Sequence, residues 1–253
     1  MTLDFHSNRW MPNLAGVALQ KTNNQKLIIP TRETLSQLRS FDKEKYADAL
    51  WAYVDGSFIV RRLYLKRLST MLSLLQQLPS ARIVEIGAGS GILMCSLKSI
   101  SDYVVGVDLN DHLAAVRKIM MTQQGLDLDF VRSDVKYLPF RSSSVDLIVS
   151  VSVLEHVPSG SLSGVMSEIN TTLNSSGHFA LGYPIESPLV KAFFKSVEFN
   201  FSAEHCSKAT EIRKAVKECF KRLLKSKRLP FGGLPDYLSF YETILVSKSD
   251  QFH

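Results

Sequence analysis

The chain has 253 residues, of which 45% are hydrophobic and 21% charged, a balance that argues against disorder and against fibrous repeats. Its net charge of +6 is unevenly spread, with +5 over residues 1–80, −4 over residues 81–190 and +5 over residues 191–253. The basic flanks are consistent with a surface for an anionic partner, nucleic acid or a membrane. Solvated helix faces are the favoured alternative, because no aromatic residues alternate with the basic ones.

No apolar run of about 18 residues predicts a transmembrane helix, and no basic segment followed by an apolar one predicts a secretory signal. The three cysteines, Cys95, Cys206 and Cys219, are too few and too scattered for a disulfide scaffold or a zinc site. We therefore expect a reducing, cytoplasmic setting and no metal site.

Residues 1–80 predict an N-terminal helical extension that caps the rest of the chain. Three helices are expected there, over residues 32–40, 43–54 and 57–78. The first has two candidate N-caps, Thr31 and Thr34, and the pattern does not choose between them. The third is the clearest, because apolar residues recur on one face at steps of three and four.

From residue 81 the periodicity changes, and short apolar runs alternate with helical patterns. The apolar runs cover residues 82–86, 103–107, 128–131, 147–151 and 178–182. Helices are expected between them over residues 90–100, 111–123 and 160–173. Continuous apolar runs separated by helices indicate parallel strands that are covered on both faces. Residues 81–253 therefore predict one domain with a doubly wound, Rossmann-like and mostly parallel α/β sheet.

The C-terminal part predicts two more helices, over residues 187–196 and 208–219, and a closing antiparallel strand over residues 240–246. The basic stretch 221–229 is a candidate partner for that strand. Residues 184–239 are expected to form an insertion on the substrate side.

A glycine-rich turn follows the first expected strand, with Glu85 two residues before Gly87-x-Gly89-x-Gly91. Glycines there let the chain bend and let a ligand approach the backbone. A dinucleotide site needs Gly-x-Gly-x-x-Gly/Ala, and its third position would fall on Ile92, which argues against a nicotinamide enzyme. The stretch resembles motif I of class I S-adenosylmethionine-dependent methyltransferases. Their methyl donor is a sulfonium cation without phosphates, so an acidic strand end is tolerated.

Three further elements match that family in the same order. Asp108 ends the second strand, 21 residues after Gly87, where a carboxylate can accept hydrogen bonds from both ribose hydroxyls; a helix N-cap is the alternative role. Asp134 matches the acid that recognises the adenine amine in the family. The segment 145–157, which contains Leu-Glu-His-Val, is similar to ubiquinone and menaquinone methyltransferases.

The resemblance covers about residues 81–183 and implies S-adenosyl-L-methionine as the cofactor. The residues it places at the cofactor are Glu85, Gly87, Ala88, Gly89, Gly91, Asp108, Leu109, Asp134, Val135, Ser150 and Val151. The implied activity is methylation of a small molecule, lipid-like acceptors included, on oxygen or carbon. An RNA or protein methyltransferase and a catalytically inactive cofactor-binding interaction protein stay open as alternatives, as does the oligomeric state.

A general base helps methyl transfer when the acceptor is a hydroxyl. His156, at the mouth of the fourth strand, is the candidate catalytic residue, with a purely structural role as the alternative. His205 is a second candidate, with a place on the surface as the favoured alternative, and Tyr183 and Glu186 are candidate substrate contacts. Tyr46 and Tyr53 are candidate lid residues, although tyrosine at helical spacing is more often part of the core.

Overall fold

The computed structural model describes residues 26–41, 50–75, 78, 82–185, 187, 205–220, 222–230 and 238–248. The helix expected over residues 187–196 and most of the helix expected over residues 43–54 lie outside the described residues.

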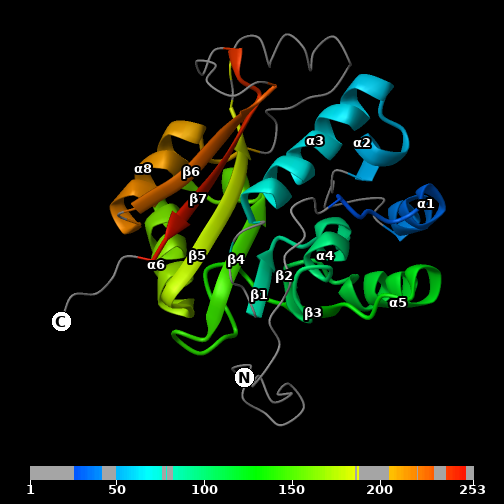
Figure 1. Cartoon of the computed structure of the whole chain (residues 1–253), viewed down its shortest axis with the longest axis horizontal. Helices are drawn as coiled ribbons and strands as arrows, with labels where there is room; N and C mark the ends of the chain where they lie inside the picture. Colours follow the sequence, from blue (N-terminus) through cyan, green and yellow to red (C-terminus); the bar gives the residue numbers. More distant parts are fainter. Residues whose placement is uncertain are drawn as a thin grey trace.

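A seven-stranded sheet forms the centre of the molecule, in the order β3-β2-β1-β4-β5-β7-β6 (Figure 1). Its strands are β1 (Arg82–Ile86), β2 (Tyr103–Asp108), β3 (Asp129–Arg132), β4 (Val145–Val151), β5 (Leu173–Pro184), β6 (Arg222–Leu229) and β7 (Tyr241–Ser247). The first five strands are parallel, and β7 runs antiparallel to both of its neighbours, β5 and β6. The predicted Rossmann-like sheet with an antiparallel closing strand is confirmed, and so is the pairing of the basic stretch with that strand.

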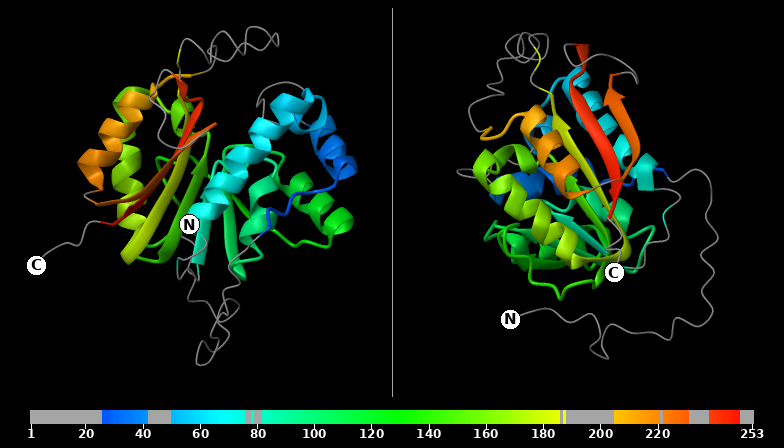
Figure 2. Two further views of the ribbon diagram at one scale, coloured as in Figure 1. Left: turned by 45° about the horizontal axis from the view of Figure 1, so that its top comes forward. Right: turned by 90° about the vertical axis from the view of Figure 1, so that its left-hand side faces the viewer.

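Helices cover the sheet on both faces (Figures 1 and 2). One face carries α3 (Phe58–Leu75), α4 (Ile92–Leu97) and α5 (Leu113–Gln124), with α1 (Arg32–Phe41) and α2 (Leu50–Val54) packed beyond them. The other face carries α6 (Leu162–Thr172) and α8 (Ala209–Cys219). Two short 3₁₀ turns, η1 (Leu154–His156) and η2 (Ser159–Ser161), connect β4 to α6.

The two-sided cover explains why the central strands are apolar along their whole length. In β4, for example, Val145, Leu147, Ile148 and Val149 are all fully buried, on alternate sides of the sheet. The edge strand β6 is the opposite case, since its Lys and Arg side chains are mostly exposed. Charged side chains on an edge strand oppose pairing with a further strand.

The N-terminal helices share the core on the α3 face of the sheet. Thr31 is the N-cap of α1, because its hydroxyl accepts the Thr34 N–H at 3.3 Å and its carbonyl accepts the Leu35 N–H at 2.9 Å. This settles the choice between Thr31 and Thr34. The apolar face of α3, which includes Tyr64 and Leu68, packs over β5 and β7.

Two elements differ in length from their predictions. Helix α4 is shorter than expected because Gly91, with φ +71°, adopts a left-handed conformation and the helix begins only after it. Strand β5 is longer than residues 178–182, because it pairs with β4 on one side and along its last seven residues with β7 on the other. Among the described residues, no helix is both long enough and apolar enough to cross a membrane.

Candidate functional site

The carboxyl ends of β3, β2, β1 and β4 lie side by side at one edge of the sheet. The chain runs outward from β1 to β2 and β3 and then returns to β4 on the other side of β1. In open α/β sheets, ligands bind beyond the carboxyl ends of the strands at such a reversal. This edge is therefore where the predicted cofactor-binding residues should gather.

The turn after β1 has a backbone conformation that favours glycine. Gly87, Gly89 and Gly91 have φ values of +68°, +49° and +71°. The N–H groups of Gly87 and Ala88 donate to the carbonyl of Val107, at 2.7 and 3.1 Å. These bonds fix the turn against the end of β2.

Asp108 connects the glycine turn to the end of β2. Its Oδ2 accepts the Gly89 N–H at 2.8 Å, and its Oδ1 accepts the Asn110 N–H at 2.9 Å. Each carboxylate oxygen has a second lone pair, so both can still accept a hydroxyl. The alternative role of Asp108 as a helix N-cap is wrong, because His112 is the residue that precedes α5.

Leu109 and the residues after β3 complete the outer part of this edge. Leu109 leaves half of its surface exposed, although it is apolar. Asp134 is partly buried, and its Oδ1 accepts the Lys136 N–H at 2.9 Å. Val135, which follows it, packs against the core on the α6 face. An exposed leucine that follows Asp108 at the end of β2, together with Asp134 after the neighbouring β3, suits a ligand with a flat apolar ring and hydroxyl or amine donors.

Glu85, Ser150 and Val151 lie deeper. Glu85 is 4% exposed. Burial and the neighbouring Glu85 charge raise the pKa of the Cys95 thiol to about 12, which places the carboxylate close to α4. Ser150 is fully buried, and its Oγ has no hydrogen-bond partner among the described residues. Val151 packs against the core on the α3 face.

Together these residues fit the cofactor that the sequence predicts. The turn brings bare backbone to the strand ends, Asp108 contacts it through the Gly89 N–H, and its glycine spacing is not the one suited to pyrophosphate. The buried, unpartnered Ser150 hydroxyl adds a polar group beside the same strand ends.

A second group of polar side chains gathers at the end of β4. Arg67 of α3 donates from Nη1 to the Ser152 hydroxyl at 2.8 Å, and the Ser152 hydroxyl lies 3.1 Å from the Tyr241 hydroxyl. The Arg67 guanidinium also stacks over the Tyr64 ring, 3.8 Å from its centroid. We call Arg67, Ser152 and Tyr241 the arginine cluster.

Sequence reasoning missed the arginine cluster. Its members are separated by 85 and 89 positions along the chain, and only the packing of α3 over β7 brings them together. The sequence pattern predicts that Arg67 lies on the solvent-exposed face of its helix. The signal that could have found it is the placement of arginine next to the apolar residue Leu68 on a helix that must cover the sheet.

The glycine turn and the segment after β4 are in direct contact. A Cβ atom on Gly87 would lie 2.1 Å from Cγ2 of Val153, far closer than side chains approach one another. Val153, which contacts the glycine turn, directly follows Ser152 of the arginine cluster in the chain. The two groups therefore form one continuous site.

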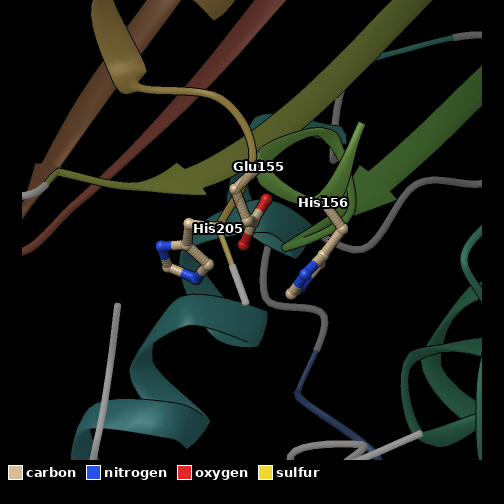
Figure 3. Close-up of side chains that lie close together, drawn as sticks. All are labelled: Glu155, His156 and His205. Carbon is tan, nitrogen blue, oxygen red and sulfur yellow. The ribbon is translucent and has the colours of Figure 1, made fainter. Parts of the chain in front are cut away.

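Three more side chains meet beyond Val153. Figure 3 shows the Glu155 carboxylate between the imidazole rings of His156 and His205. One potential ligand atom from each of the three lies within 4.8 Å of the others, and the ring centroids are 5.4 Å apart. Burial raises the pKa of Glu155 to about 7, although the neighbouring His156 and Arg67 charges oppose this shift. Sequence spacing indicated no metal-ligand group; the fold brings this one together, and we call it the histidine–glutamate cluster.

Two predicted substrate contacts lie in the core instead. Tyr183 is fully buried and donates its hydroxyl to Glu242 at 2.7 Å on the α6 face, so its predicted contact with substrate is wrong. Tyr53 is 5% exposed and packs edge-on against Tyr64, with centroids 5.8 Å apart, so a lid role is wrong as well. Glu186 and Tyr46 lie outside the described residues.

Comparison with known proteins identifies the class of domain in the central part of the chain. Residues 84–181 match a family model described as a methyltransferase domain. The ubiquinone biosynthesis O-methyltransferase of Hahella chejuensis is 30% identical over 82 residues, which make up 32% of this chain and 34% of that relative. The match thus spans about a third of the relative's length.

Solved structures share the fold at low sequence identity. A protein of Pyrococcus horikoshii OT3 superposes with a TM-score of 0.62 at 16% identity, covering 79% of this chain and 96% of that one. The magnesium protoporphyrin IX methyltransferase of Synechocystis PCC 6803, solved with bound SAH, superposes with a TM-score of 0.58 at 16% identity, covering 86% and 95%. At these identities the matches establish a common fold.

Proposed function

We propose that the chain is a class I S-adenosylmethionine-dependent methyltransferase that transfers a methyl group to an oxygen atom of a small organic molecule; the match of residues 84–181 to a methyltransferase domain supports this. The observation that carries this proposal is the contact between Gly87 and Val153. It joins the residues suited to a methyl donor to a polar cluster suited to an acceptor.

The donor half of the site is formed by the ends of β1, β2 and β3. When bound, S-adenosylmethionine supplies a methyl group already activated on a sulfonium. Asp108 holds the glycine turn through Gly89 and keeps lone pairs for the ribose hydroxyls. Asp134 and the half-exposed Leu109 are the proposed contacts of the adenine ring. These residues bind and orient, which is most of what a protein must do for this reaction.

The acceptor half is the arginine cluster with the neighbouring histidine–glutamate cluster. Arg67 places a fixed positive charge and hydrogen-bond donors beside the end of β4. Such a charge stabilises an oxygen that has lost its proton, and it gives no comparable help at a carbon acceptor. This favours methylation on oxygen, which is also the reaction in the name of the Hahella chejuensis relative. The role of His156 as a general base stays a prediction.

The test uses purified protein incubated with cell extract and with cofactor labelled in its methyl group. We expect mass spectrometry to find the label in a small molecule, on an oxygen atom. Arg67→Gln should lower the transfer rate at least tenfold, which corresponds to about 1.4 kcal/mol of transition-state stabilisation. The matched control is Lys66→Gln, which removes an exposed charge from the adjacent position of the same helix.

Label found in RNA or protein instead would contradict the proposed acceptor class and support an alternative that the basic flanks leave open. Absence of any labelled product would contradict enzymatic activity and support a cofactor-binding interaction protein.

A further inference from the structure

The histidine–glutamate cluster presents three side chains of the kind that bind transition metals. Glu155 and His156 belong to η1, and His205 lies just before α8. One carboxylate oxygen and two imidazole nitrogens lie within 4.8 Å of one another. This mixture suits zinc and its neighbours among the transition metals, whereas magnesium and calcium prefer oxygen ligands throughout.

The backbone already holds the two ligand-bearing segments together. The Glu155 carbonyl accepts the N–H groups of Cys206 and Ser207, at 2.7 and 3.0 Å. The buried Ser207 hydroxyl donates to the carbonyl of Val157 at 2.5 Å. His205 is therefore fixed beside η1, although it lies fifty positions further along the chain. Only side-chain rotation is needed to bring the three ligand atoms onto one ion.

Glu155 supplies an independent reason to expect a cation. The residue is 2% exposed, and its Oε2 is buried with no hydrogen-bond partner among the described residues. A carboxylate in such a place is costly unless a cation or hydrogen-bond donors compensate it. A backbone hydrogen bond, a hydrogen bond from Ser152 and the nearby Arg67 charge stabilise this carboxylate in part, but within the described part of the chain Arg67 forms no ion pair with it and Oε2 stays without a hydrogen-bond partner. A metal ion at Oε2 would supply the missing partner.

We propose that Glu155, His156 and His205 bind one divalent transition-metal ion of the zinc class and leave its fourth position open. Zinc bonds of about 2.1 Å in a tetrahedron place ligand atoms about 3.4 Å apart. The observed ligand atoms lie within 4.8 Å of one another, so side-chain rotations need to shorten these distances by no more than about 1.4 Å. Three protein ligands with an open position are the arrangement of a catalytic zinc site, whereas structural sites have four.

The role of the ion rests on the proposed methyl transfer. Its open position would take the acceptor hydroxyl and lower the pKa of that group, so that its proton would leave to solvent. The oxygen would then form its bond to the methyl carbon while the bond from that carbon to the donor sulfur breaks, its electron pair stays on sulfur, and the neutral thioether S-adenosylhomocysteine leaves. His156 would then bind the ion and would not itself accept the proton. The acceptor class is a small molecule with an ionisable hydroxyl group, held as an oxyanion between the ion and Arg67.

The test measures metal binding directly, with the full chain stripped of metal by a chelator. We expect isothermal titration with Zn²⁺ to show one tight site, and Co²⁺ to give the strong visible absorption of a four-coordinate ion. His156→Ala and His205→Ala should each weaken Zn²⁺ binding at least tenfold. Both side chains reach the surface, so these variants should fold; an unchanged affinity of His205→Ala for S-adenosylmethionine checks this.

Two matched controls accompany the test. His112→Ala removes an exposed histidine elsewhere, and Cys206→Ser removes the exposed thiol next to His205; neither should change Zn²⁺ binding. The absence of a stoichiometric site, or equal losses in His112→Ala and His205→Ala, would overturn the proposal. A loss in Cys206→Ser as large as in His205→Ala would overturn the ligand set.

Failure of this proposal and failure of the proposed function give different results. Zn²⁺ binding that depends on His156 and His205, without methyl transfer, would support the metal site and contradict the enzyme. Methyl transfer that persists in chelator, without a stoichiometric Zn²⁺ site, would support the enzyme and overturn the metal site.

Discussion

Gly87 is the residue on which the two halves of the site depend. Its φ of +68° is unfavourable for any other residue by about 1–2 kcal/mol, and the missing Cβ leaves the space that Val153 fills. The glycine thus serves both the turn and the close approach of the segment after β4.

Gly87→Ala should therefore lower the free energy of unfolding by at least about 2 kcal/mol, because strain and steric overlap add. Urea unfolding monitored by circular dichroism measures this loss. Gly160→Ala is the matched control, since nothing lies within 4 Å of a Cβ there, and its effect should be small.

The steric part of this explanation has its own check. Adding Val153→Ala to Gly87→Ala should recover part of the lost stability, because the smaller side chain makes room for the new methyl group. Purely additive losses in the double variant would contradict the contact as the cause.

At the level of elements, the buried Glu242 carboxylate joins its own strand, β7, to β5, β6 and α8. The Glu242 side chain is 5% exposed, and it accepts hydrogen bonds from Tyr183 of β5 at 2.7 Å and from Arg213 of α8 at 2.5 Å. Arg228 and Ser226 of β6 donate to its other oxygen, at 3.1 and 3.2 Å. Burial alone would raise the pKa of Glu242, but the hydrogen bonds from Tyr183 and Arg213 outweigh it and lower that pKa below its ordinary value.

Glu242→Gln should destabilise the protein by about 3–5 kcal/mol at neutral pH, because it removes the buried negative charge with which Arg213 and Arg228 pair. A lowered pKa means that the contribution is present above the unfolded-state value of about 4.3 and is lost as the pH falls through the folded-state value. The stability difference between wild type and variant should therefore shrink in acid.

Unfolding curves of both proteins from pH 7 down to about pH 3 measure this difference. A difference that stays constant over this range would contradict the assignment, and Glu218→Gln, at an exposed pair on α8, is the control.

The sequence predicted elements well where the signal was local. The apolar runs located all five parallel strands, and the glycine spacing located the left-handed turn after β1, which Asp108 holds through the Gly89 N–H. Interactions between distant segments were not predictable in this way. Arg67, Tyr241 and the grouping of Glu155 with His205 each depend on how α3, β7 or the segment before α8 packs against the end of β4. Tyr183 was misassigned because a position next to a strand end does not reveal which face of the sheet the side chain takes.

At the scale of the whole molecule, the sheet order determines where the chemistry sits. The reversal between β1 and β4 brings the donor residues of β1–β3 next to the end of β4, and the N-terminal helix α3 covers that end and contributes Arg67. The acceptor half thus combines residues from the beginning, middle and end of the chain. The donor half lies within the stretch that matches the family model.

The central claim is that this edge of the sheet binds S-adenosylmethionine through Asp108, and calorimetric titration of the cofactor tests it most directly. The account predicts that wild type binds the cofactor and that Asp108→Ala binds at least tenfold more weakly, a loss of about 1.4 kcal/mol. Asp127→Ala, which removes an exposed acid paired with Arg117, should bind like wild type. Equal affinity of wild type and Asp108→Ala, with both folded, would contradict the account.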